Sequence, residues 1–128
     1  MTFDKNFFSK QKFTDEELKK YKRSAKRDLD IAKTNKEPEV VFHFTYMALV
    51  KIGIYCLASE GYRIKGRPGH HQILIEFLSR HFKSEDILIV GDKMRKDRNL
   101  DFYGADTLGP HEDIAENLKF VSDLYNKL

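Results

Sequence analysis

The chain has 128 residues, a length that fits one domain with its own hydrophobic core. Hydrophobic residues make up 41% of the chain and charged residues 34%, and the formal net charge of +3 is too small by itself to indicate nucleic-acid binding. A single cysteine excludes an intrachain disulfide and a cysteine-based zinc site, and no apolar run reaches the roughly 20 residues that span a membrane. The first residues also lack the apolar stretch of a signal peptide. We therefore expect one cytoplasmic domain over residues 1–128, without a membrane partner.

The first part of the chain predicts an arm followed by a helix. Residues 1–13 show no clear periodicity but are rich in phenylalanine, so we expect an N-terminal arm that packs onto the body of the domain. Thr14 and Glu17 have the spacing of a capping box, in which each side chain accepts a hydrogen bond from the backbone N–H of the other. Apolar residues then recur at helical spacing up to about Asn35, which predicts the first helix.

A second helix is predicted from Pro38, a residue suited to a first helical turn, to Glu60, just before Gly61. This helix is apolar on nearly every side, which is typical of the centre of a bundle or of a dimer face, and we expect both roles. Lys51 is the one charge in its middle. Its ammonium group either reaches the surface along its flexible stem or, if the helix lines a dimer cleft, contacts phosphate.

The rest of the chain predicts a loop and three more helices. Residues 62–69 carry two glycines and a proline, as expected of a loop, and a third helix follows over 70–82. Ser84 is a suitable cap for a fourth helix, in which Gly91 costs about 1 kcal/mol relative to alanine and permits a kink or break. Pro110 opens a last helix. No strand pair is indicated, so we expect an all-α fold, an antiparallel up-and-down four-helix bundle with an additional C-terminal helix.

The end of the fourth helix carries the most informative motif. Asn99 and Tyr103 are four residues apart and share a helix face, and Gly104 suits the left-handed end of a helix. Arg98 supplies a guanidinium group that binds phosphate through two parallel hydrogen bonds. The motif therefore favours chemistry directed at phosphate. The alternative is structural, with Arg98 paired to a neighbouring aspartate and the tyrosine packed at the helix end.

Cations gather in three clusters, over residues 19–27, 61–71 and 93–98. They either meet on one surface that attracts phosphate or lie on separate solvated faces. The candidate RNA-binding residues outside the motif are Arg95, Lys96, Arg63, Lys65, Arg67, His70, His71 and Lys51.

His70 and His71 begin the third helix beside the cations of the preceding loop. A helix N-terminus favours anions and lowers the pKa of a histidine, which keeps the ring neutral and able to act as a base. The alternative is that both rings cap the helix or pack against the loop. Adjacent histidines on a helix point in different directions, and no second ligand pattern accompanies them, so we expect no metal and no cofactor.

The order of the long apolar helix, the basic loop, the two histidines and the arginine motif resembles that of the HEPN superfamily of small helical bundles. The resemblance covers about residues 40–125. The residues that carry the resemblance are Ser59-Glu-Gly-Tyr62, the basic loop, His70-His71 and Arg98-Asn99-x-x-x-Tyr103-Gly104. The resemblance implies a homodimer with a shared cleft and, in many members, a metal-independent ribonuclease, sometimes a toxin whose antitoxin partner is a nucleotidyltransferase. Other members only bind RNA, a nucleotide or a partner protein.

The family motif maps onto Arg98 and Asn99, but tyrosine stands at position 103 where the resemblance implies histidine. Histidine titrates near pH 6.5 and can exchange protons at neutral pH, whereas tyrosine titrates near pH 10 unless a cation lowers its pKa. Arg98, Asn99 and Tyr103 are thus the candidate catalytic residues. Three hypotheses follow: an RNA-cleaving enzyme, a non-catalytic binding module, and an interaction protein whose motif is structural.

Overall fold

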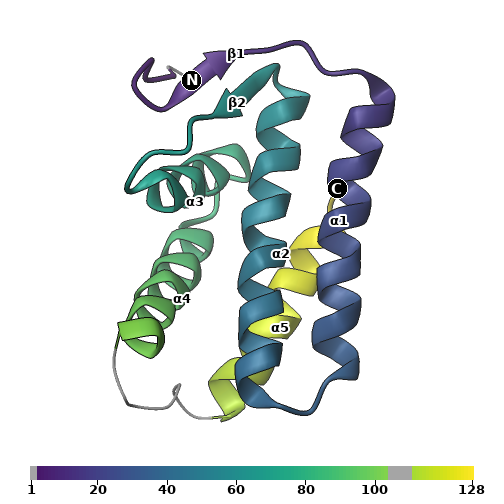
Figure 1. Cartoon of the computed structure of the whole chain (residues 1–128), viewed down its shortest axis with the longest axis vertical. Coiled ribbons are helices and arrows are strands. Elements are labelled where there is room, and N and C mark those ends of the chain that lie inside the picture. The colour runs from purple at the N-terminus through teal and green to yellow at the C-terminus, as the bar shows by residue number, and fades with distance from the viewer. Residues whose placement is uncertain (1–2, 104–110) are drawn as a thin grey trace.

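The computed structural model describes the backbone of residues 3–103 and 111–128, and the side chains of residues 3–98 and 113–128. The described chain is mostly helical with one small sheet (Figure 1). Its elements are β1 (Phe8–Lys10), α1 (Asp15–Thr34), α2 (Pro38–Ser59), β2 (Tyr62–Ile64), α3 (His70–His81), α4 (Glu85–Tyr103) and α5 (His111–Tyr125).

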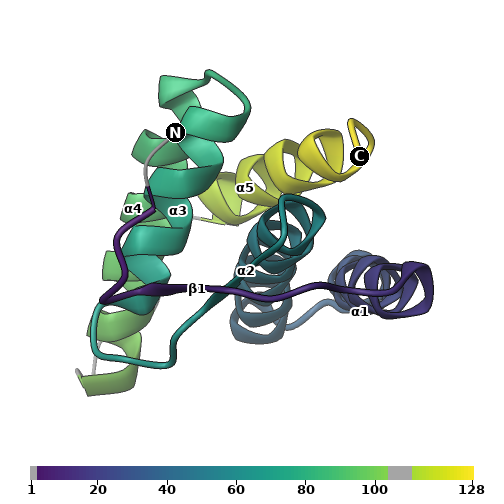
Figure 2. The same cartoon turned by 90° about the horizontal axis from the view of Figure 1, so that it is seen from above.

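Helix α2 lies at the centre of the molecule. It packs most extensively against α1 and also contacts α3, α4, α5 and β2, so the helix pairs are consistent with a bundle. In the view from above, α1 lies on one side of α2 and the α3–α4 pair on the other (Figure 2). Helix α2 is long and apolar enough to cross a membrane, but 61% of its most apolar window is buried inside the protein. This burial explains why the helix is apolar all round, as expected for the centre of a bundle.

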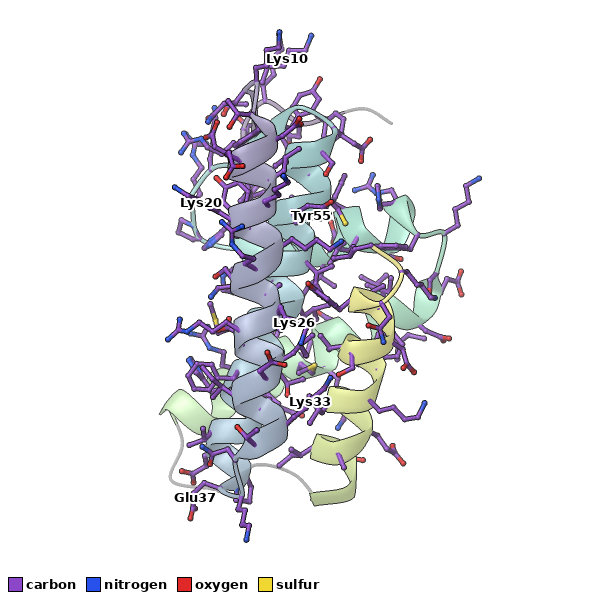
Figure 3. All side chains as sticks on the ribbon, turned by 90° about the vertical axis from the view of Figure 1, so that its right-hand side faces the viewer. Lys10, Lys20, Lys26, Lys33, Glu37 and Tyr55 are labelled. Carbon is purple, nitrogen blue, oxygen red and sulfur yellow. The ribbon has the colours of Figure 1, made fainter. Side chains whose placement is uncertain are left out.

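The beginning of α1 confirms the predicted capping box. Thr14 Oγ1 accepts a hydrogen bond from the Glu17 backbone N–H at 3.2 Å, and Glu17 Oε1 accepts one from the Thr14 N–H at 3.0 Å. Figure 3 views the α1 side of the molecule, where Lys20, Lys26 and Lys33 are exposed. The basic cluster at 19–27 is therefore on a solvated helix face.

The arm packs onto the body as predicted, but it does so partly as a strand. β1 pairs antiparallel with β2, with Phe8 opposite Ile64, and the ring of Phe3 stacks on that of Tyr62 at a centroid distance of 3.9 Å. The prediction that the chain has no strand pair is therefore wrong, as is the assignment of all of 62–69 to a loop. Strands of three residues are too short to show an alternating pattern in the sequence.

Helix α4 runs through Gly91 without the break that this glycine permits. A Cβ at this position would lie 2.8 Å from Ile75 Cγ2 and 3.3 Å from Leu49 Cδ2. Glycine here allows α4 to approach α3 and α2 closely, which offsets its low helix propensity. The predicted helix start at Pro110 and the predicted helix end at Gly104 lie outside the described residues.

A candidate phosphate-binding pocket

A cavity of about 420 Å³ lies between α2, α4 and the beginning of α3. It is lined by Tyr46 of α2, by loop residues 66–69, by residues 70–72 of α3, and by Arg95 and Arg98 of α4. Three segments that are far apart in the sequence thus contribute to one pocket. Five of the predicted site residues line it, namely Arg67, His70, His71, Arg95 and Arg98.

The beginning of α3 presents a helix N-terminus to the pocket. Gly69 is the N-cap, with a φ of 83°, and no side chain caps this end of the helix. The turn before it is closed by a hydrogen bond from the His70 backbone N–H to the Arg67 carbonyl at 3.0 Å. The first turn of α3 contains no acidic residue. The backbone N–H groups and the positive end of the helix dipole therefore favour an anion in this pocket.

Tyr46 forms the buried wall of the pocket and is 0% exposed. Its hydroxyl lies 3.0 Å from His71 Nδ1, and the guanidinium carbon of Arg98 lies 5.4 Å from the centre of its ring. Burial raises the pKa of the Tyr46 phenol to about 12, against the opposing effect of the Arg98 and Arg95 charges. At neutral pH Tyr46 is therefore an uncharged phenol, and its ring makes a cation–π contact with Arg98.

His71 is neutral at pH 7 because its pKa is lowered to about 4. Burial is the largest cause, followed by the nearby His70, Arg98 and Arg95. For His71 the direction of the shift is as predicted, but its causes are burial and the neighbouring side chains rather than the helix N-terminus.

Arg95 is held in place by an acid on its own helix. Its Nε and Nη2 both donate to Asp92 Oδ1, at 3.1 and 2.9 Å, and Lys96 lies 3.0 Å from Asp92 Oδ2. Hydrogen bonds from Lys96 and Arg95 lower the pKa of Asp92. Two cations share this one carboxylate, so a net positive charge remains on this stretch of α4.

The remaining RNA-binding candidates do not line this pocket. Lys65 donates from Nζ to the Lys5 carbonyl at 2.8 Å and ties the arm to the loop, and Arg63 is exposed on β2. Asn99 and Tyr103 belong to the last turns of α4, and their side chains lie outside the described part of the structure.

Lys51 points to the opposite side of α2 and pairs with Asp28 of α1. Its Nζ lies 2.7 Å from Asp28 Oδ2, and the side chains are 25% and 2% exposed respectively. The same oxygen has no hydrogen-bond partner at a suitable angle, so the contact is a charge pair rather than a directed hydrogen bond. Lys51 therefore compensates a buried carboxylate instead of only reaching into solvent.

Sequence reasoning missed the role of Tyr46. In the sequence it is one of many apolar or aromatic residues in the second predicted helix, and no local pattern separates it from them. The other histidines contribute nothing to the pocket among the described residues: His81 Nδ1 lies 2.9 Å from Glu60 Oε2, and His43 is exposed. Within the same residues, no group of three His, Cys, Asp or Glu side chains is placed to hold a metal.

Known proteins give no independent assignment of the pocket. Comparisons of the chain with protein-family models, with curated proteins and with solved structures found no match. Any function of this chain must therefore be inferred from the geometry and charge of the pocket itself.

Proposed function

We propose that this protein is a HEPN-like, RNA-directed protein whose pocket binds a phosphate group of RNA. The observation that carries the proposal is that Arg67, Arg95 and Arg98 line one cavity together with His71. Guanidinium groups stay charged at any physiological pH and bind phosphate oxygens in pairs.

The surroundings of these cations also favour an anionic ligand. The uncapped N-terminus of α3 lines the same cavity and adds backbone N–H donors. Tyr46 and His71 are neutral, so they neither repel an anion nor cancel the charge of the arginines. The cavity of about 420 Å³ lies in the usual size range of ligand sites and has room for a phosphate with its sugar.

The finer architecture and the partners belong to the same proposal. The central position of α2 supports the antiparallel up-and-down four-helix bundle with an additional C-terminal helix. Asn99 and Tyr103 follow Arg98 on α4, and we assign them to the same phosphate site. Homodimerisation and a nucleotidyltransferase antitoxin partner remain part of the hypothesis, and light scattering after gel filtration measures the first of them.

The binding proposal is tested with single-stranded RNA labelled with a fluorophore, whose anisotropy is measured at several salt concentrations. We compare the double variant Arg95→Ala/Arg98→Ala with the control Lys20→Ala/Arg63→Ala, which removes the same charge at exposed positions outside the cavity. We expect the pocket variant to lose at least about tenfold in affinity and to show a shallower salt dependence, because fewer phosphate contacts release fewer counterions. Equal losses in the two variants would show that only the net charge attracts RNA, and the pocket would then not be the site.

Metal-independent RNA cleavage is the second candidate function. It is favoured by the position of His70 and His71 beside Arg98, because cleavage through the 2′-hydroxyl needs a proton acceptor near a bound phosphate. Purified protein is incubated with mixed RNA in EDTA, beside the variants Arg98→Ala and Tyr103→Phe. Cleavage that both variants lose supports an enzyme. RNA binding without cleavage leaves the binding module as the function.

A further inference from the structure

The two adjacent histidines of the pocket are held by different partners. Their ring centroids are 4.4 Å apart. His70 Nδ1 lies 2.7 Å from the carbonyl oxygen of Arg67, and His71 Nδ1 lies 3.0 Å from the hydroxyl of Tyr46. In a neutral imidazole one ring nitrogen carries a hydrogen and the other accepts, and the hydrogen bond made by one nitrogen sets the role of the other.

The partner of His70 can only accept a hydrogen bond, because it is a carbonyl oxygen. His70 Nδ1 must therefore carry the hydrogen and donate it to Arg67. In the neutral ring, this leaves His70 Nε2 with a free lone pair, which makes it an acceptor.

The partner of His71 is a hydroxyl, which can donate or accept, so burial decides between the two. Tyr46 is 0% exposed, and among the described residues His71 is the hydrogen-bond partner of its hydroxyl. If His71 Nδ1 donated to Tyr46, the buried phenol hydrogen would lack an acceptor there, which costs more free energy than the hydrogen bond itself contributes. The phenol therefore donates to Nδ1, and the hydrogen of His71 resides on Nε2.

We propose that His70 and His71 are fixed in opposite tautomers, so that the pocket presents an acceptor and a donor side by side to a phosphate with a neighbouring hydroxyl. His71 Nε2–H donates to a phosphate oxygen, and His70 Nε2 accepts from the 2′-hydroxyl of a ribose. This inference rests on the proposed binding of RNA and deepens it, because DNA lacks the 2′-hydroxyl and loses the second contact.

Tyr46 is the positioning residue of this arrangement. Its hydroxyl sets the tautomer of His71, and its ring lies against the guanidinium of Arg98. Tyr46 thus acts on the ligand through two other side chains, while its own hydroxyl is occupied by His71.

The tautomers are measured first, without any nucleic acid. Protein with ¹⁵N-labelled histidine is studied at pH 8 by long-range ¹H–¹⁵N correlation spectra, which distinguish a protonated Nδ1 from a protonated Nε2. We expect Nδ1–H for His70 and Nε2–H for His71. Tyr46→Phe keeps the buried ring but should shift His71 toward the Nδ1–H form, whereas the control Tyr55→Phe, on the same helix but outside the cavity, should not. The same tautomer in both native rings would overturn the inference.

The second measurement compares RNA and DNA oligonucleotides of one sequence. We expect the native protein to prefer RNA, and His70→Ala to lose about fivefold in RNA affinity with little change for DNA, as for the loss of one hydrogen bond. His71→Ala should weaken RNA and DNA alike, and the exposed His43→Ala should change neither. Equal affinity of the native protein for RNA and DNA would overturn the inference while leaving phosphate binding intact. Failure to bind either nucleic acid would overturn the proposed function, and the spectra would still decide the tautomers.

Discussion

Lys51 of helix α2 and Arg98 of α4 lie on opposite sides of α2, and their surroundings give them different roles. Lys51 lies 2.7 Å from the buried carboxylate of Asp28, on the α1 side. Arg98 lies over the ring of Tyr46 on the α4 side, in a cavity that the neutral phenol of Tyr46 and the neutral imidazole of His71 also line. The sequence offers both cations as phosphate contacts. The comparison teaches that the partner of a cation, rather than its presence, decides whether its charge is available to a ligand.

The physical difference is that the partner of Lys51 carries a charge and the partner of Arg98 does not. A buried carboxylate needs a counter-charge, so Lys51 is committed to Asp28 and a phosphate would have to compete with it. An aromatic ring attracts a guanidinium through its quadrupole but carries no net charge, so the contact with Tyr46 does not cancel the charge of Arg98. The two sides of α2 are accordingly a structural ion pair and a candidate binding site.

The largest expected effect is the loss of stability on breaking the buried pair. Lys51→Met leaves Asp28 uncompensated, and we expect the free energy of unfolding to fall by about 3 kcal/mol, at the low end for buried pairs because Lys51 is partly exposed. Urea denaturation measures this change. The control Lys26→Met breaks the exposed pair with Asp30 and should leave the free energy of unfolding nearly unchanged. A Lys51→Met protein that is stable but binds RNA poorly would contradict this assignment, because Lys51 would then contact RNA rather than stabilise the fold.

Next in size is the effect of Arg98→Lys on binding. Lysine keeps the charge but loses the planar fork and much of the contact with Tyr46, so we expect RNA affinity to fall about tenfold, or about 1.4 kcal/mol. The free energy of unfolding should change by less than about 1 kcal/mol. Fluorescence anisotropy and urea denaturation measure the two quantities. An unchanged affinity would mean that Arg98 acts only as a point charge.

A smaller effect is expected in the pH dependence of stability. The pKa of His71 is about 4 in the folded protein against 6.5 for an ordinary histidine, so between these pH values the unfolded chain binds more protons than the folded one. The free energy of unfolding should therefore fall as the pH drops through this window. Because the ring is only partly buried, we expect His71→Asn to remove about 1 kcal/mol of the difference between pH 7 and pH 5. An identical pH dependence in the native protein and the variant would contradict the neutral, buried imidazole.

The smallest effect is expected at Lys65, a predicted RNA contact that binds the arm instead. Lys65→Met removes the hydrogen bond to the Lys5 carbonyl, and we expect a loss of about 0.5 kcal/mol in stability. RNA affinity should change less than about twofold, because the side chain lies outside the cavity. If Lys65→Met lowered the RNA affinity as much as Arg98→Lys does, the binding site would have to include the loop.

Local signals predicted the helices well, because each one acts within a few residues. The capping box at Thr14, the proline at position 38 and the glycine at position 61 mark helix boundaries that the structure contains. The strand pair and the unbroken α4 were not predictable in the same way. Both depend on contacts between distant segments, β1 with β2 and Gly91 with Ile75.

In the candidate site, too, some residues are recognisable from the sequence and others only from contacts between distant segments. Arg98, His70 and His71 stand out in the sequence through their residue types and their positions near helix ends. Tyr46 does not, because an aromatic residue in an apolar helix is typical of any core. Likewise, nothing around Lys51 in the sequence indicates its pairing with Asp28, which lies on another helix.

The sequence by itself determined the mostly helical class, the helix boundaries at Thr14, Pro38 and Gly61 and the residue types able to bind phosphate, because propensity, capping and side-chain chemistry act locally. Only the tertiary structure decided which cations meet in one cavity and which are paired elsewhere. That choice depends on how α2 is packed between α1 on one side and the α3–α4 pair on the other. Burial and long-range contacts thus separate the charge that stabilises the fold, at Lys51, from the charge that can bind a ligand, at Arg98.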